Sequence, residues 1–200
     1  HHRLGDGAVK GQTSYGVPVF REGLAPNVET VNRLIAAYWR PWHEKLAAIV
    51  ADTAVKLVVD CHSMAATGPA AYDDPYALRP RVSVSNLGNA QGEPRENWAH
   101  ISAPPQAARF LGQRLGELLA DVPDLAATSA PYALNQPYLG GWGMRLYGGS
   151  YKPWLMIELN RALYIGPQSS DSPIVPPDHA LLTRLRERLW QAIEEVAELV

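Results

Sequence analysis

The sequence is poor in cysteine, in net charge and in long apolar runs. Its 200 residues include one cysteine, Cys61, which excludes an internal disulfide and a multi-cysteine metal site and suits a reducing cytoplasm. The formal net charge is -2, and no run of basic residues favours nucleic acid or an anionic membrane as a partner. No stretch approaches the roughly 18 unbroken apolar residues of a membrane span. We therefore expect a cytoplasmic protein whose partner is a small molecule.

Hydrophobic residues make up 46% of the chain, which is enough for one sizeable core and favours a single domain over residues 1–200. The first residues lack a methionine and any hydrophobic period. His1 and His2 are either the remnant of a purification tag or an internal point of a longer chain. We therefore expect that the natural N-terminal segment is missing.

Strand patterns alternate with helical patterns along the chain. Apolar, β-branched runs predict buried strands at 55–60 and 153–159, with further strands within 81–88 and 126–134. Three- and four-residue spacing predicts helices over 28–53, with an interruption at Pro41, and over 105–120 and 178–199. This order indicates an α/β fold, a three-layer sandwich in which helices flank a mostly parallel or mixed central sheet.

Two of the predicted strands end in ionisable groups. In "VKLVVDCHSM" the apolar run is followed by Asp60 and His62, and "PWLMIEL" carries Glu158 near its end. If these strands are neighbours, His62 and Glu158 reach one reacting centre, and Asp60 can orient the imidazole. That arrangement suits metal-assisted hydrolysis. A structural, hydrogen-bonded His62 remains the alternative.

Other reactive groups are weaker candidates. Cys61 and His62 are consecutive, so in a strand they point to opposite faces and form a poor nucleophile–base pair. Arginines in loops, namely Arg79, Arg81 and Arg145, can hold a substrate carboxylate with two hydrogen bonds or can be solvated surface residues. The sequence leaves both readings of the arginines open.

Several segments together resemble a known family. The stretches "VPVFREGL", "YWRPWHEKL", "VVDCHSM", "LNQPYLGGWGMRLYG" and "IELNRALYIG" occur in the order typical of N-formylglutamate amidohydrolases, over about 17–166. The resemblance implies a fold like that of the zinc carboxypeptidases and a single zinc ion. It also implies hydrolysis of N-formyl-L-glutamate to formate and L-glutamate, a late step in histidine degradation.

The resemblance also assigns roles to individual residues. It implies that His62 is the last protein ligand of zinc and that Glu158 is the general base. Arg145 would hold a carboxylate of the substrate, and Asn86 and Asn160 would donate hydrogen bonds to it. The family places another histidine ligand and an acidic ligand in a segment before the first residue of this chain.

Two alternatives to this function stay open. One is a carboxypeptidase-like hydrolase that acts on a short peptide or another amide. The other is a metal-free domain that binds an acidic metabolite without catalysis. The long irregular segment 67–100 suggests a subgroup whose substrate differs from formylglutamate.

Overall fold

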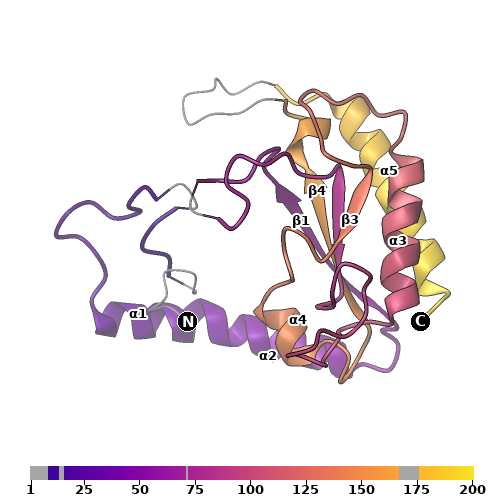
Figure 1. Cartoon of the computed structure of the whole chain (residues 1–200). Helices are drawn as coiled ribbons and strands as arrows, with labels where there is room; N and C mark the ends of the chain where they lie inside the picture. Colours follow the sequence, from indigo (N-terminus) through magenta and orange to yellow (C-terminus); the bar gives the residue numbers. More distant parts are fainter. Residues whose placement is uncertain (1–8, 14–15, 71, 167–175) are drawn as a thin grey trace.

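The computed structural model describes residues 9–13, 16–70, 72–166 and 176–200, and a four-stranded sheet forms its centre (Figure 1). The order of the strands across the sheet is β1-β4-β2-β3. β4 runs parallel to β1 and antiparallel to β2, and β2 runs parallel to β3. The predicted mixed sheet is therefore confirmed. The strands are β1 (Val58–Met64), β2 (Val82–Ser85), β3 (Tyr132–Leu134) and β4 (Trp154–Asn160).

Helices cover both faces of this sheet, which confirms the three-layer sandwich. α3 (Pro105–Leu118) and α5 (His179–Ala197) lie side by side against one face (Figure 1). Residues of α2 (Arg40–Ala51) and of the short α4 (Trp142–Tyr147) pack on the other face. A 3-10 helix, η3 (Arg161–Leu163), follows β4 directly. None of the helices in the described ranges is long and apolar enough to cross a membrane.

The first helical run confirms the predicted interruption near Pro41. α1 (Val28–Leu34) is capped at its N-terminus by Asn27, whose side chain accepts a hydrogen bond from the backbone N–H of Thr30 at 2.8 Å. The π-helix η2 (Ile35–Trp39) separates α1 from α2, and the N–H of Arg40 bonds to the carbonyl of Ile35. Proline has no N–H to donate, so the wider turn before it avoids a clash between its ring and the preceding turn.

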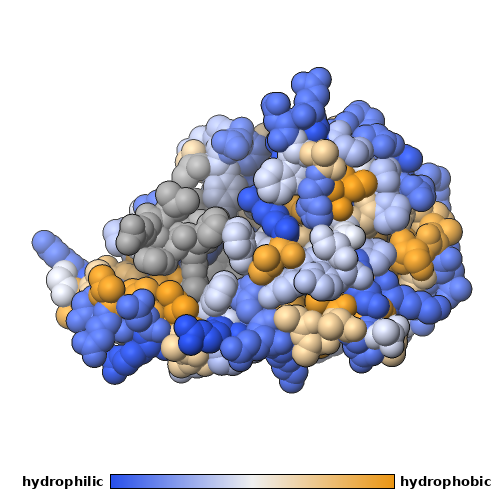
Figure 2. Space-filling view, turned by 90° about the horizontal axis from the view of Figure 1, so that it is seen from below, coloured by the Kyte–Doolittle hydropathy of each residue, from blue (hydrophilic) through white to orange (hydrophobic). Residues whose placement is uncertain are grey.

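The N-terminal end of this run extends away from the sheet (Figure 1). α1 and η2 contain no buried residue, and apolar residues are exposed on this end (Figure 2). Val19 and Phe20 lie with Leu34, Tyr38 and Trp39 around an open hollow. The well-packed part of the molecule is therefore the sheet and the helices that cover it.

The two faces of the sheet have different cores. Under α3 and α5 the core is large and continuous, and it includes Val84, Leu111 and Ile157. Under α2 and α4 it is smaller and reaches only the first half of β4, at Trp154 and Met156. Beyond Met156, this second face carries polar side chains.

β1 begins and ends later than the sequence predicts. The strand expected at 55–60 runs from Val58 to Met64, so His62 lies within it and not after it. Each residue of β1 has a partner on β4. Backbone pairing with a buried neighbour thus continues the strand past the end of its apolar run.

Other boundaries also differ from the expectation. The strand expected over 126–134 is only Tyr132–Leu134, because Pro131 lacks the N–H that a strand residue donates. α4 lies in the glycine- and aromatic-rich block 135–166, where the sequence predicted turns. The predicted linker at 167–177 lies almost wholly outside the described residues.

Candidate active site

His62 and Glu158 lie side by side on neighbouring strands. Their Cα atoms are partners in the parallel pair of β1 and β4, and partnered side chains project from the same face of a sheet. This is the face of α2 and α4, because Met156, two residues before Glu158, belongs to the core under those helices. The condition for a shared site, that these two strands are neighbours in the sheet, is therefore met.

Asp60 contacts the imidazole of His62. Its Oδ1 lies 2.9 Å from Nε2 of His62, and the side chains of His62 and Asp60 are 48% and 33% exposed. A carboxylate this close to one ring nitrogen favours one orientation of the ring by electrostatic attraction and leaves the other nitrogen, Nδ1, for a ligand. This is the orienting contact that the sequence predicted.

Cys61 separates Asp60 from His62 and projects from the opposite face of the strand. Partial burial raises the pKa of its thiol, and the neighbouring Asp60 charge raises it further. A raised pKa leaves less thiolate at neutral pH. The orientation of the Cys61 side chain and the raised pKa of its thiol therefore both disfavour Cys61 as a nucleophile.

Glu158 is the most deeply buried acidic group of this cluster, with 8% of the residue exposed. Burial raises the pKa of its carboxyl above the ordinary value, and the charge of Asp60 adds to that effect. His62 and Arg79 oppose it without cancelling it. A carboxylate with a raised pKa is a stronger proton acceptor near neutral pH, as a general base requires.

Arg79 is a buried cation whose charge acts on Glu158. The sequence alone did not decide whether this arginine binds a substrate carboxylate or lies at the surface. Only 2% of it is exposed. Its Nε and Nη2 donate to the two oxygens of Asp74 at 2.7 and 3.0 Å, and its Nη1 donates to the hydroxyl of Tyr138 at 2.8 Å. These three bonds fix its guanidinium, so Arg79 is placed to tune Glu158 and not to bind a carboxylate from solvent.

Ser83 is a second neighbour of Glu158 that sequence reasoning missed. It is the register partner of Glu158 on β2 and is fully buried. Its hydroxyl has no hydrogen-bond partner among the described residues. The alternation of "RVSVSN" would place Ser83 opposite the valines, but no local signal shows that β2 pairs with β4.

The two asparagines that the resemblance assigned to substrate binding are fully buried. Nδ2 of Asn86 donates to the carbonyls of Gly92 and Ala103 at 2.7 and 3.1 Å. Nδ2 of Asn160 donates to the carbonyl of Pro80 at 2.9 Å. Both amides thus hold loops together beside the site, and their contact with substrate stays a prediction.

Arg145, the predicted carboxylate clamp, lies in α4 and is exposed. Its side chain forms no hydrogen bond or ion pair with any residue in the described ranges. The structure therefore leaves Arg145 accessible at the surface, and its contact with a substrate carboxylate stays a prediction.

A family model described as N-formylglutamate amidohydrolase matches residues 2–165. This chain belongs to that family. An N-formylglutamate deformylase of Pseudomonas aeruginosa is 29% identical over 160 residues, which cover 77% of this chain and 52% of that protein. An N-formylglutamate deformylase of Pseudomonas putida is 27% identical over 188 residues, which cover 88% of this chain and 62% of that protein. The chain spans little more than half the length of these curated relatives, and no solved structure matches it significantly.

The described part of the chain does not supply a complete zinc site. No group of three or more His, Cys, Asp or Glu residues placed to hold a metal occurs within residues 9–13, 16–70, 72–166 and 176–200. A catalytic zinc usually has three protein ligands. His62, with its half-exposed ring, fits one of those positions, and the described residues do not fill the others.

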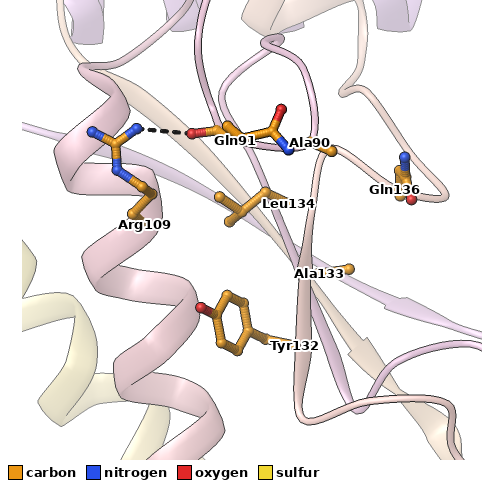
Figure 3. A pocket seen from close by; sticks show the side chains of 7 residues that line it. All are labelled: Ala90, Gln91, Arg109, Tyr132, Ala133, Leu134 and Gln136. Carbon is orange, nitrogen blue, oxygen red and sulfur yellow. Dashed lines mark hydrogen bonds between the residues drawn. The ribbon is translucent and has the colours of Figure 1, made fainter.

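The hollow at the opposite edge of the sheet lacks an acid–base pair. It lies between α3 and β3, two strands away from β4, and is lined by residues that include Gln91, Arg109 and Tyr132 (Figure 3). Arg109 already donates to the carbonyl of Gln91 and to Glu93. We therefore place the candidate active site at His62 and Glu158.

Proposed function

We propose that this protein hydrolyses the amide bond of an N-acyl amino acid and that its substrate is N-formyl-L-glutamate. The observation that carries the proposal is the buried carboxylate of Glu158 beside the accessible imidazole of His62. Membership of the family, and the names of the two relatives, support the substrate. The products would be formate and L-glutamate, as in the degradation of histidine in the cytoplasm.

Glu158 would accept the proton of the attacking water. Burial raises the pKa of Glu158, so transfer of a proton to the ionised carboxylate is favourable when water attacks the formyl carbon. The same carboxyl group would then give the proton to the leaving amine of glutamate. Asp60 would keep the imidazole of His62 in one orientation throughout.

We also propose zinc as the cofactor, with His62 as one ligand. When bound, zinc would polarise the formyl carbonyl and lower the pKa of water. The exposed ring of His62 supports its part in such a site, while the remaining ligands would come from outside the described residues. Arg145 is proposed to bind a carboxylate of the substrate, because it is exposed and a guanidinium matches a carboxylate with two hydrogen bonds.

The activity is tested by the release of formate from two substrates by the natural-length protein. We expect kcat/KM for N-formyl-L-glutamate to exceed that for N-formyl-L-norleucine by at least about a hundredfold, because the second substrate lacks the side-chain carboxylate. No formate from either substrate would refute the proposed function. Equal rates would retain the hydrolysis but refute recognition of the carboxylate.

The cofactor is tested by elemental analysis after dialysis against a weak chelator. We expect about one zinc ion per chain in the wild type and a clear loss in His62→Ala, because one of three protein ligands is removed. His179→Ala, at the exposed start of α5, is the matched control and should retain the metal. Unchanged zinc in His62→Ala would exclude His62 as a ligand, and a metal-free wild type would favour a binding domain without catalysis.

A further inference from the structure

The hydroxyl of Tyr138 accepts one hydrogen bond, and its own proton remains available for donation. It accepts a hydrogen bond from Nη1 of Arg79 at 2.8 Å. Its own proton is donated to no described group. A phenol that accepts from a cation becomes a stronger donor through its remaining proton.

Arg79 cannot leave this position to bind a substrate itself. Asp74 holds it with two hydrogen bonds, and its guanidinium carbon lies 5.0 Å from the ring centroid of Tyr138 and 5.6 Å from that of Tyr72. The residue is almost fully buried. It therefore acts as a fixed positive charge behind the hydroxyl of Tyr138.

Tyr138 lies on the face of the sheet that carries Glu158. Its ring packs against the core that contains Met156, two residues before Glu158 on β4. The carbonyl of Leu139, the residue after Tyr138 in the chain, accepts a hydrogen bond at 2.8 Å from Ser85 of β2, two residues from Ser83, the register partner of Glu158. Burial raises the pKa of Tyr138, so the hydroxyl keeps its proton near neutral pH.

We propose that the O–H of Tyr138 donates a hydrogen bond to the carbonyl oxygen of the scissile amide, with Arg79 as the residue that positions it. This inference rests on the proposed function. When the water oxygen bonds to the carbonyl carbon, the π electrons move onto the carbonyl oxygen, and the water proton goes to Glu158. When that electron pair returns, the C–N bond breaks and the amine takes the proton. Tyr138 stabilises the charge on the oxygen between these two events.

The test begins with Tyr138→Phe, which keeps the ring and removes only the hydroxyl. We expect kcat for N-formyl-L-glutamate to fall about 10²- to 10³-fold, the usual loss for one oxyanion donor. KM should change by less than about threefold, because the hydrogen bond strengthens mainly in the transition state. Tyr132→Phe, at the opposite edge of the sheet, loses the same group and should keep wild-type kcat.

Binding of an analogue tests the same contact without turnover. The probe is an H-phosphinate in which tetrahedral phosphorus replaces the formyl carbon and CH2 replaces the amide NH. Tyr138→Phe should bind it at least about tenfold more weakly than the wild type, while its affinity for L-glutamate stays the same. Equal loss of affinity for both ligands would indicate a damaged fold and overturn the proposal.

Arg79→Lys tests whether Arg79 acts through Tyr138. The single variant should lower kcat, and the double variant with Tyr138→Phe should be no slower than Tyr138→Phe alone, since the two residues act as a unit. Multiplying losses would assign Arg79 a separate structural role and refute its positioning of Tyr138.

The outcomes also separate the two proposals. An active wild type with an equally active Tyr138→Phe refutes the role of Tyr138 alone. A wild type that neither releases formate nor binds the phosphinate refutes both the role and the proposed function.

Discussion

The two faces of the central sheet are built differently. Under α3 and α5, apolar side chains pack without interruption, and Leu155 and Ile157 of β4 are part of that core. On the other face, the core ends at Met156, and the next side chain of β4 on that side is Glu158. One strand thus contributes to the apolar core on one face and to the candidate active site on the other, because its side chains alternate.

The polar face of the sheet lowers the stability of the folded protein because it buries charged side chains. A buried carboxylate or guanidinium lowers stability unless other groups compensate it. Arg79 is compensated fully by Asp74 and Tyr138, whereas Glu158 retains a raised pKa. We infer that the incomplete compensation of Glu158 is what makes this face reactive, while the opposite face provides the stability that tolerates it.

The largest effect is expected for Glu158→Gln, which removes the proposed proton acceptor. Turnover of N-formyl-L-glutamate should fall by at least about a hundredfold, as for the loss of a general base, while the content of the proposed zinc ion should match that of the wild type. Formate release and elemental analysis measure the two quantities. Glu187→Gln, on the exposed surface of α5, is the control and should match the wild type. Retained turnover in Glu158→Gln would show that Glu158 is not the proton acceptor and that the two faces do not differ in this respect.

On the apolar face, Leu111→Ala should show the opposite pattern. Leu111 is fully buried in α3, so its truncation should lower the free energy of unfolding by about 2–5 kcal/mol. The kcat of the folded fraction should not change. Denaturant titration and formate release measure both, and Leu182→Ala on the more exposed side of α5 is the matched control. A large loss of kcat in folded Leu111→Ala would mean that the two faces are not independent.

A smaller effect is expected for Arg145→Ala. The side chain is exposed and unpaired within the described residues, so its removal should leave stability unchanged. KM for N-formyl-L-glutamate should rise about tenfold, since a charge-assisted hydrogen bond to a carboxylate is lost. Steady-state kinetics measure this KM, with Arg186→Ala at another exposed site as the control. An unchanged KM would mean that another cation holds the carboxylate.

The smallest effect is a dependence of stability on pH. Because the pKa of Glu158 is higher in the folded than in the unfolded chain, ionisation of Glu158 destabilises the fold above that raised pKa. Glu158→Gln should therefore be more stable than the wild type at neutral pH, and the difference should disappear as the pH falls below the ordinary pKa of glutamate. Thermal unfolding at several pH values measures it. A constant or reversed difference would contradict the burial of an uncompensated charge.

The sequence predicted the layers of the fold better than the details of the site. Long periodic helices and the buried strand of Glu158 were legible, because periodicity records which side chains face the core. The end of β1 could not be predicted in the same way, since pairing with β4 continues the strand through Asp60 and His62. α4 was missed because Gly143 within it disfavours a helix and tertiary packing overrides that preference.

The groups around Glu158 were the hardest to predict. His62 and Glu158 each follow an apolar run, which is a local signal. Arg79 and Tyr138 are 59 positions apart, and neither has a pattern that indicates the other. Their contact depends on how the loops before β2 and after β3 fold over the sheet, and no local periodicity encodes that.

The most direct test of the central claim is a carboxyl ¹³C NMR titration of the glutamates, with Glu158→Gln to assign the resonance of Glu158. We expect Glu158 to titrate above the ordinary pKa of a glutamate, because burial opposes its ionisation more strongly than His62 and Arg79 favour it. A pKa at or below the ordinary value would show a fully compensated, structural carboxylate and would contradict the assignment of this face as the reactive one.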